Sequence, residues 1–240
     1  MQNSVYVGLS SQISLERRLD AIAQNVANMS TPGFRATGMK FDTLVSTVAD
    51  DVSFSSAGRS YIKTEAGPVI PTGNPLDIAV KGDAWLSLAT PAGQVYTRDG
   101  RMVMTVDGEL QSVNGYSILD AGGQPLMVNP NGGPIRIASD GAVYQNDAQI
   151  GAVGLFTISK DAKLTYFDNS AIVPDMPAEP VVDNAAYGVI QGSIEGSNVD
   201  SITEMTRLIS VTKAFERVDA LLRESESTFS QAIKTLGSKT

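Results

Sequence analysis

The residues of this chain that could do chemistry are serines, lysines and carboxylates, because it contains no histidine and no cysteine. That composition excludes Ser-His and Cys-His catalysis, disulfides and Cys/His zinc sites. The remaining arrangement for a nucleophile is Ser-Lys, and the S-x-x-K pattern occurs at Ser60 to Lys63 and at Ser210 to Lys213. Two matches to so short a pattern are unremarkable, and neither S-D-N nor K-T-G follows. We therefore predict no catalytic serine.

The carboxylates and aromatic residues also have simpler interpretations than chemistry. Asp99, Asp107, Asp140 and Asp147 stand in Asp-Gly or Asn-Asp pairs, where a short carboxylate caps the backbone of a turn, and no segment has EF-hand spacing. Gly151-Ala-Val-Gly154 lacks the third glycine of a dinucleotide-binding motif. Trp85 and the tyrosines of the middle region could line a ligand groove, but core packing explains them as well. We predict no enzyme, no metal and no cofactor; an enzyme built on carboxylates paired across strands is the alternative.

The net charge of −8 is unevenly distributed. Residues 1–41 carry a net charge of +2, residues 199–240 carry none, and residues 42–198 carry −10. Such an acidic middle repels nucleic acid and anionic membranes. No uncharged apolar run approaches the roughly 18 residues of a spanning helix, and the start lacks the basic region of a Sec signal peptide. We expect no nucleic-acid partner, no membrane insertion and no cleaved signal peptide.

Glycine and proline are absent between Leu9 and Thr31 and between Ser197 and Leu236, which predicts a helix at each end. The C-terminal helix has a seam at alternating spacings of three and four, which is the a/d pattern of a coiled coil. The seam positions are Leu208, Val211, Phe215, Val218, Leu222, Ser225, Phe229, Ala232 and Leu236. Ser201 to Glu204 resembles a capping box, with Asn198 and Asp200 as alternative starts.

The N-terminal helix has a weaker seam, which fades toward its start through Gln12 and Gly8. Its positions are Leu15, Leu19, Ile22 and Val26. Core helices of a globular bundle would show the same pattern. Because only two such helices exist, a helix pair suits the chain better than a bundle.

The middle of the chain predicts short antiparallel strands joined by hairpins. Asp99-Gly100, Asp107-Gly108, Asn114-Gly115 and Asp140-Gly141 are dipeptides typical of hairpin turns. The predicted fold class is α+β, with paired N- and C-terminal coiled-coil-like helices flanking a central antiparallel all-β domain. The predicted divisions are an N-terminal helix (1–35), a connecting segment (36–74), a β-rich outer domain (75–186), a second connecting segment (187–198) and a C-terminal helix (199–240).

The stretch "NVANMSTPGFRA" ends the first helix abruptly. Pro32 lacks an amide hydrogen and disfavours helical geometry at the residue before it. Gly33 permits a positive φ and a sharp turn. The charged side chain of Arg35 must be either solvated or paired with an opposite charge. Asn25 and Asn28 share a helical face without a local role, so their amides are either solvated or bonded to neighbouring chains.

These residues resemble the bacterial flagellar rod and hook proteins. Residues 25–36 are similar to their N-terminal signature, close to N-L-A-N-x-x-T-x-G-F-K/R, and "EGSNVDSITEMTRLIS" (195–210) is similar to their C-terminal signature. "TGNPLDIAVKGDAWLSL" (72–88) and "YTRDGRM" (96–102) resemble the opening of their β-domain. The four matches span the chain in the family's order, with departures at Val26, at residues 84–86 and at Met102. The length and both ends are most similar to the proximal-rod branch, with the distal-rod branch as the alternative.

The resemblance implies a structural subunit of the basal-body rod, which polymerises through its terminal helices into a helical hollow shaft. Such a shaft transmits torque and carries the export channel. The implied partners are other proximal and distal rod subunits, further copies of this chain, and the export apparatus and rod cap during assembly. The implied location is the periplasmic rod of the flagellar basal body, reached unfolded through the flagellar type III apparatus. The rival interpretation is a β-domain that binds glycan or protein and dimerises through coiled-coil ends.

The residues expected at subunit interfaces lie on the two seams, at the end of the first helix and at the start of the last. They are Leu15, Leu19, Ile22, Asn25, Val26, Asn28, Thr31, Gly33, Phe34, Asn198, Met205, Leu208, Val211, Phe215, Val218, Leu222 and Phe229.

Overall fold

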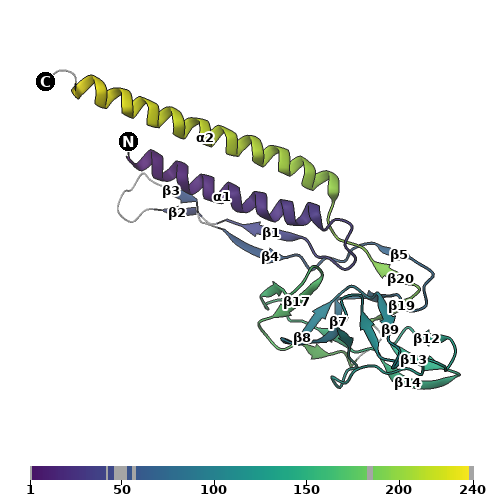
Figure 1. Ribbon diagram of the computed structural model, residues 1–240. Helices are drawn as coiled ribbons and strands as arrows, with labels where there is room; N and C mark the ends of the chain where they lie inside the picture. Colours follow the sequence, from purple (N-terminus) through teal and green to yellow (C-terminus); the bar gives the residue numbers. More distant parts are fainter. Residues whose placement is uncertain (1, 42, 46–52, 56–57, 183–185, 238–240) are drawn as a thin grey trace. The chain divides into compact units, whose positions relative to one another are not determined.

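The computed structural model describes residues 2–41, 43–45, 53–55, 58–182 and 186–237. Helix α1 (Gln2–Ala27) and helix α2 (Ser201–Gly237) stand at the two ends of the chain, and strands occupy the region between them (Figure 1). The predicted α+β class is confirmed, with two terminal helices and a β-rich, mainly antiparallel middle. Neither helix is long and apolar enough, within the described residues, to cross a membrane.

The described strands are short, and they pair mainly antiparallel. In chain order they are β1 (Thr37–Lys40), β2 (Thr43–Val45), β3 (Ser53–Ser55), β4 (Arg59–Ile62), β5 (Val69–Pro71), β6 (Ile78–Lys81), β7 (Ala84–Thr90), β8 (Gly93–Thr97), β9 (Met102–Met104), β10 (Leu110–Ser112), β11 (Ser117–Ile118), β12 (Ile135–Ile137), β13 (Ala142–Gln145), β14 (Ala148–Ala152), β15 (Leu155–Thr157), β16 (Leu164–Tyr166), β17 (Ala171–Pro174), β18 (Glu179–Pro180), β19 (Gly188–Gln191) and β20 (Ser193–Glu195).

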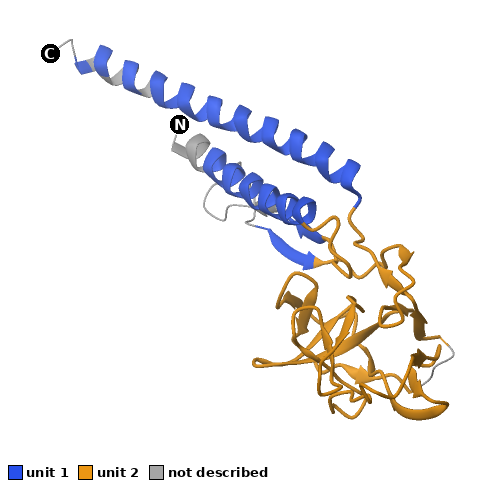
Figure 2. Ribbon diagram, turned by 45° about the vertical axis from the view of Figure 1, so that its right-hand side comes forward, with its two compact units in different colours: residues 1–27, 37–61, 200–240 blue, residues 28–36, 62–199 orange. Residues whose placement is uncertain are grey.

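The structure divides into two compact units (Figure 2). Unit 1 contains residues 1–27, 37–61 and 200–240, and unit 2 contains residues 28–36 and 62–199. The segment that follows α1 therefore belongs to unit 2, while most of the connecting segment predicted at 36–74 lies in unit 1. The functional domain limits predicted from the sequence remain a prediction.

In unit 1 the two helices lie side by side, and α1 also contacts strands β1 and β3 (Figure 1). Helix α2 begins after Asp200, one of the alternative starts, rather than with the predicted box at Ser201. The Asp200 carboxylate accepts hydrogen bonds from the amides of Ile202 (3.1 Å) and Thr203 (3.3 Å) and from the Thr203 hydroxyl (2.6 Å). These bonds to the charged form, that of the hydroxyl first, lower the pKa of Asp200. At about 1.5 Å per residue, α2 is roughly 55 Å long.

The side of α2 that carries the predicted seam is its less exposed side. From Leu208 to Ser225 the seam positions are half-buried, whereas Lys213 and Glu216 beside them are exposed. The side chains of Phe229, Ala232 and Leu236 lie outside the described part of the chain. The α1 seam does not simply fade: a Cβ atom at Gly8 would collide with the Leu222 side chain. Gly8 therefore lets the Leu222 side chain approach closely, and a larger residue would force that side chain to shift.

Unit 2 is built on a sheet that, among the described strands, has nine members. Seven follow the order β16-β17-β8-β7-β11-β10-β9, while β15 pairs with β7 and β18 pairs with β15. Successive strand residues face opposite sides of a sheet, and here both sides are covered. Ala84, Leu86 and Leu88 of β7 belong to the larger apolar core, while Trp85 between them belongs to a smaller one. Strand β7 is therefore buried on both faces from Ala84 to Leu88.

Three of the four predicted hairpin dipeptides are confirmed. Gly108, Gly115 and Gly141 have φ values of 86°, 82° and 87°, and they lie between paired strands. The prediction for Asp99-Gly100 is wrong, because β8 and β9 on either side of it are not neighbours in the sheet. Asp99 is only 7% exposed, and a Cβ atom at Gly100 would collide with the carbonyl of Ile78. Here glycine permits a close backbone approach inside the unit, which the dipeptide alone does not distinguish from a turn.

Candidate functional site

The segment 28–36 is a short, tightly bonded turn of unit 2. The amide of Thr31 donates to the carbonyl of Asn28 (3.1 Å), and the amide of Phe34 donates to the carbonyl of Thr31 (3.2 Å). The Thr31 hydroxyl also donates to the Asn28 side-chain oxygen (3.1 Å). Asn28 therefore has a local role within the turn, which the sequence did not indicate.

Gly33 is required in this turn for two reasons. Its φ is 71°, as predicted, which is a conformation that residues with a side chain rarely adopt. Its backbone also lies against another segment, since a Cβ atom at Gly33 would collide with the backbone of Arg98 and Asp99. The Gly33 amide donates to the carbonyl of Glu195 (2.8 Å), so three distant segments meet at this residue.

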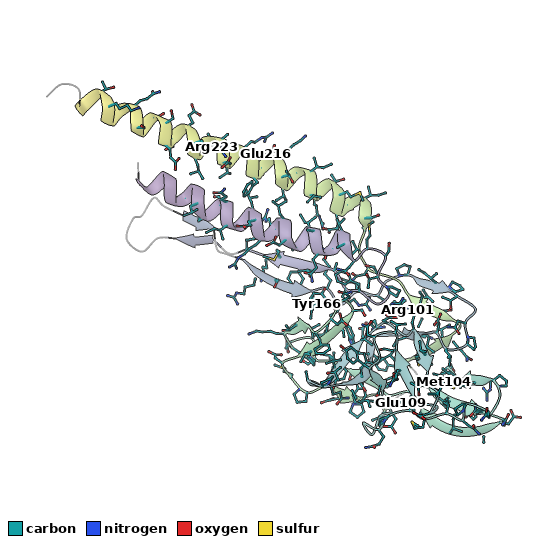
Figure 3. The ribbon with its side chains drawn as sticks, viewed as in Figure 1. Arg101, Met104, Glu109, Tyr166, Glu216 and Arg223 are labelled. Atoms are coloured by element: carbon teal, nitrogen blue, oxygen red, sulfur yellow. The ribbon has the colours of Figure 1, made fainter. Side chains whose placement is uncertain are left out.

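Phe34 is completely buried and stacks on Tyr166 of β16, with ring centroids 5.6 Å apart and planes 3° from parallel. The Tyr166 hydroxyl, labelled in Figure 3, donates to the backbone carbonyl of Arg35. One aromatic residue of the sheet thus holds both the side chain and the backbone of the turn. Apolar contact and a hydrogen bond from the same side chain fix the turn on unit 2.

A buried ion cluster lies directly behind the turn. Arg35 Nη1 lies 2.6 Å from Glu195 Oε1, and Arg98 Nη1 donates to Glu195 Oε2 at 3.1 Å. All three side chains are 1% exposed. The amide of Gly67 donates to Glu195 Oε1 as well (2.8 Å). Because a buried charge without a partner is costly, the one carboxylate stabilises both guanidinium groups.

Arg98 has further partners that hold it in the cluster. Its Nη1 donates to the carbonyl of Val80 (3.2 Å), and its Nη2 donates to the carbonyl of Gly82 (2.6 Å). Burial lowers the pKa of Arg98 to about 10, while the nearby Glu195 carboxylate opposes that shift and Arg35 adds to it. Arg98 therefore remains charged at neutral pH, and the cluster contains two cations and one anion.

Trp85 covers the cluster. The guanidinium carbons of Arg35 and Arg98 lie over its ring, 5.6 and 5.3 Å from the centroid, which is within cation–π range. Trp85 is the only tryptophan of the chain, and it packs in the smaller core with Ile62 and Tyr96. The aromatic face offsets part of the desolvation of the two cations, and it makes Trp85 a natural reporter of the cluster.

The chain passes between the two units at four places, after residues 27, 36, 61 and 199, and hydrogen bonds on unit 2 tie these passages together. The Asn198 side chain accepts from the Ala36 amide (2.6 Å) and donates to the Glu65 carbonyl (2.8 Å). Its own amide donates to the carbonyl of Phe34 (3.3 Å), and the amide of Lys63 donates to the carbonyl of Ala36 (2.9 Å). Asn198 thus bonds to two other segments at once.

Asn25 performs a comparable role in unit 1. It is 2% exposed, its amide nitrogen donates to the carbonyl of Thr37 (3.0 Å), and its oxygen accepts from the Thr37 amide (2.7 Å). Neither interpretation given above for this side chain, solvation or bonding to a neighbouring chain, describes it. Asn25 instead pairs with strand β1 as another strand would, using both its donor and its acceptor.

The residues predicted for subunit interfaces fall into three groups in the structure. Buried within the chain are Ile22, Asn25, Gly33 and Phe34. Half-buried are Leu15, Leu19, Val26, Asn28, Thr31, Asn198, Leu208, Val211, Phe215, Val218 and Leu222. Met205 is 46% exposed, and the side chain of Phe229 lies outside the described residues. Contact of these residues with other subunits remains a prediction.

Four residues of the site were missed from the sequence alone: Glu195, Arg98, Trp85 and Tyr166. Glu195, Arg98 and Trp85 stand in the segments that resembled the flagellar family. They could have been singled out as candidate site residues because each is a charged residue or a tryptophan within such a segment. Their convergence could not be read from spacing, because Arg98 and Glu195 are 97 residues apart. Among the described residues, no group of three or more potential ligands could hold a metal ion, and both Ser210 and Lys213 are exposed on α2.

Comparison with known proteins identifies the class of protein that has this fold and site. A profile described as "Flagella basal body rod protein" matches residues 5–35, one described as "Flagellar hook protein FlgE/F/G D1 domain" matches 79–145, and one described as "Flagellar basal body rod FlgEFG protein C-terminal" matches 190–234. The first match contains most of α1 and of the turn, the second contains Trp85 and Arg98, and the third contains Glu195 and most of α2. The chain belongs to the family of flagellar basal-body rod proteins, which is a family of structural subunits.

Relatives that match over the whole chain indicate which type of rod protein it is most similar to. The chain is 50% identical to the flagellar basal-body rod protein FlgF of Mesorhizobium japonicum over 100% of both chains. It is 46% identical to FlgF of Rhizobium meliloti over 99% of each. Identity to the rod protein FlgG of Agrobacterium fabrum is 28%, over 92% of this chain and 94% of that one. These relatives favour the FlgF type over the FlgG type, the distal-rod alternative left open by the sequence.

Proposed function

We propose that this chain is a FlgF-type subunit of the proximal rod, which polymerises through its terminal helices into a hollow shaft that transmits torque and carries the export channel. Its partners are other proximal and distal rod subunits, further copies of itself, and the export apparatus and rod cap during assembly. Its location is the periplasmic rod of the flagellar basal body. The names of its full-length relatives support the rod assignment.

An apolar stripe on α2 supports polymerisation through the helices. Ile202, Met205 and Ile209 follow each other at spacings of three and four, so they share one face of the helix. They are 78%, 46% and 58% exposed, whereas the seam residues of the same helix are half-buried. Large apolar side chains left exposed in such a row suit a surface that another protein chain covers. In the assembled rod, coiled-coil packing of the terminal helices would cover them.

The buried cluster carries the mechanical part of the proposal. A subunit that transmits torque must pass force between its units without bending freely where the chain crosses from one to the other. Arg35 and Glu195 fasten the crossing segments to unit 2 through a buried ion pair, and the half-buried Asn198 adds hydrogen bonds. Buried bonds of this kind are screened little by salt. The segments by which the chain leaves and re-enters unit 2 are thus firmly attached to that unit.

The experiment uses a strain that lacks its own copy of the gene and expresses either Ile209→Asp or Ser210→Asp. Burying an apolar side chain contributes about 1.5–3 kcal/mol, and a carboxylate in that position opposes burial further. We expect the amount of the Ile209→Asp protein in purified basal bodies to fall at least about tenfold, and we expect the strain not to swim. The folded protein should keep its urea midpoint, since the residue is exposed in the single chain.

Ser210→Asp is the matched control, because it places the same carboxylate one residue along, on an exposed polar position of α2. It should assemble and swim normally. Normal basal-body content of Ile209→Asp would contradict polymerisation through this helix. Phe215→Asp is a less specific probe, because Phe215 is already half-buried within the single chain.

A further inference from the structure

The chain contains two Asn-Gly dipeptides, Asn114-Gly115 and Asn131-Gly132. An asparagine before glycine can lose its side-chain amide without an enzyme, because glycine has no side chain to hinder attack by its backbone nitrogen on the asparagine Cγ. A bond forms between that nitrogen and Cγ, the bond from Cγ to the side-chain nitrogen breaks, and ammonia leaves. Water then opens the resulting succinimide at either carbonyl, which gives aspartate or isoaspartate.

Asn131-Gly132 is held in a form that opposes this reaction. Gly132 is buried, and a Cβ atom there would lie 2.5 Å from the Gln145 side chain. The buried side-chain amide of Gln145 donates to the carbonyls of Asn129 (2.8 Å) and Gly133 (3.1 Å), which flank the dipeptide. Ring closure needs a change of backbone conformation, so this loop must first detach from Gln145.

Asn114-Gly115 is open by comparison. Both residues are exposed, and no atom beyond the chain neighbours lies within 4 Å of a Cβ atom placed at Gly115. The Gly115 amide donates to the carbonyl of Ser112 (2.9 Å), which is a bond at the tip of an exposed turn. Such bonds open at little free-energy cost. The backbone here therefore reaches the reactive conformation more often than it does at Asn131-Gly132.

A carboxylate restrains the Asn114 side chain. Its Nδ2 donates to Asp168 Oδ2 (2.7 Å), which lies 54 residues away along the chain. The bond holds the side chain in place, and the negative charge opposes the build-up of negative charge on the amide oxygen as the ring closes. Because this bond is exposed to solvent, its effect is partly screened. Asp168 thus slows the reaction without preventing it.

The product of the reaction reverses the sign of this contact. A carboxylate in place of the Asn114 amide lies against the carboxylate of Asp168, so an attraction becomes a repulsion. The same two segments also meet at Tyr116 and Phe167, whose rings lie edge to face with centroids 5.8 Å apart. Repulsion between the segments therefore also weakens this aromatic contact.

The segment that would be loosened is part of the site described above. Phe167 directly follows Tyr166, which fixes the turn at 28–36 on unit 2. We propose that Asn114 is a site of spontaneous deamidation, slowed by Asp168, and that its product loosens the hairpin of β16 and β17, which carries Tyr166. The inference concerns unit 2 alone and does not depend on polymerisation.

The reaction is measured on the purified protein, which is incubated at mildly alkaline pH, digested, and assayed by mass spectrometry for aspartate and isoaspartate at each asparagine. We expect conversion at Asn114 to be at least about tenfold faster than at Asn131 in the same sample. Asp168→Ala should raise the rate at Asn114 at least about fivefold, because a hydrogen bond to a charged group is lost, and should leave Asn131 unchanged. Equal rates at the two asparagines, or a rate at Asn114 that Asp168→Ala does not raise, would overturn the inference.

An exchange of charges tests the consequence. Asn114→Asp supplies the aspartate product directly, and the amide of Phe167, which donates to the carbonyl of Ala171 (2.9 Å), reports on the hairpin. Hydrogen exchange at this amide should be at least about fivefold faster in Asn114→Asp than in the parent. Adding Asp168→Asn places one amide opposite one carboxylate again and should return the exchange to the parent rate. Unchanged exchange in Asn114→Asp, or faster exchange that Asp168→Asn does not reverse, would overturn the inference.

Discussion

Replacing Glu195 by glutamine tests whether the buried cluster holds the crossing segments in place. The substitution keeps the size of the side chain and removes its charge, so Arg35 and Arg98 are left as two buried cations without a counter-ion. Removing one partner of a buried ion pair typically costs about 3–5 kcal/mol. Since all three groups are 1% exposed, little of this cost is recovered by solvent.

The expected shift is large enough to measure directly. With a urea m-value of about 2 kcal/mol/M, a loss of that size lowers the unfolding midpoint by roughly 1.5–2.5 M. For a protein of this size it lowers Tm by about 6–20 °C. The fluorescence of Trp85 reports the transition, because this single tryptophan lies over both guanidinium groups.

Two further variants make the measurement specific. Glu179→Gln removes an exposed carboxylate of the same unit and should change the unfolding free energy by less than about 0.5 kcal/mol. Adding Arg35→Met to Glu195→Gln removes one of the two cations left without a counter-ion. The double variant should have an unfolding free energy at least about 1 kcal/mol higher than Glu195→Gln alone, because the effects of substitutions at residues in contact do not add. A Glu195→Gln midpoint within about 0.3 M of the parent, with unchanged Trp85 emission, would refute the assignment of a stabilising role to the cluster.

Two other substitutions follow from the turn and from α1. Gly33→Val should destabilise unit 2 by at least about 1–3 kcal/mol because of the positive φ at this position. The collision of the new side chain with the backbone of Arg98 and Asp99 should add to that cost. Normal motility of the Gly33→Val strain would contradict this geometry. Asn25→Ala should cost about 1–3 kcal/mol because the buried amide and carbonyl of Thr37 lose their partner. Faster hydrogen exchange at the Thr37 amide is the expected signature, with the exposed Ser30→Ala as control, and unchanged exchange would contradict the role assigned to Asn25.

The sequence was a sufficient guide wherever local rules decide the structure. Proline and glycine limits predicted both helices, positive φ at Gly33 was correctly expected, and three hairpin turns were placed correctly. The alternating spacing of the α2 seam agrees with its half-buried side. Each of these depends on a few consecutive residues, whose backbone preferences and periodicity are visible without the rest of the chain.

The misreadings concern residues whose roles depend on distant segments. Asn25 looked solvated because Thr37, its partner, lies on a strand that no pattern predicted, and Asp99-Gly100 looked like an exposed turn because the neighbouring Ile78 carbonyl is invisible in sequence. Arg35 was correctly given a choice between solvent and pairing. Only the fold shows that its partner is Glu195 and that both are buried.

The distance along the chain between the members of the cluster has a consequence for how the protein becomes folded. Arg98 and Glu195 are separated by 97 residues, and Ala36 and Asn198 by 162. Contacts between such remote residues form late, because the entropy of closing long loops must be overcome first. A chain that emerges from a channel with its N-terminus leading presents both arginines well before their carboxylate.

Until Glu195 emerges, Arg35 and Arg98 have no buried counter-ion, so water remains the better environment for both cations. If the chain is exported unfolded, as proposed, the turn at 28–36 stays detached while most of the chain is still in transit. The ion cluster then forms when only α2 remains to follow. For a subunit exported unfolded, the position of Glu195 near the end of the β region thus delays formation of the buried ion cluster until most of the chain has left the channel.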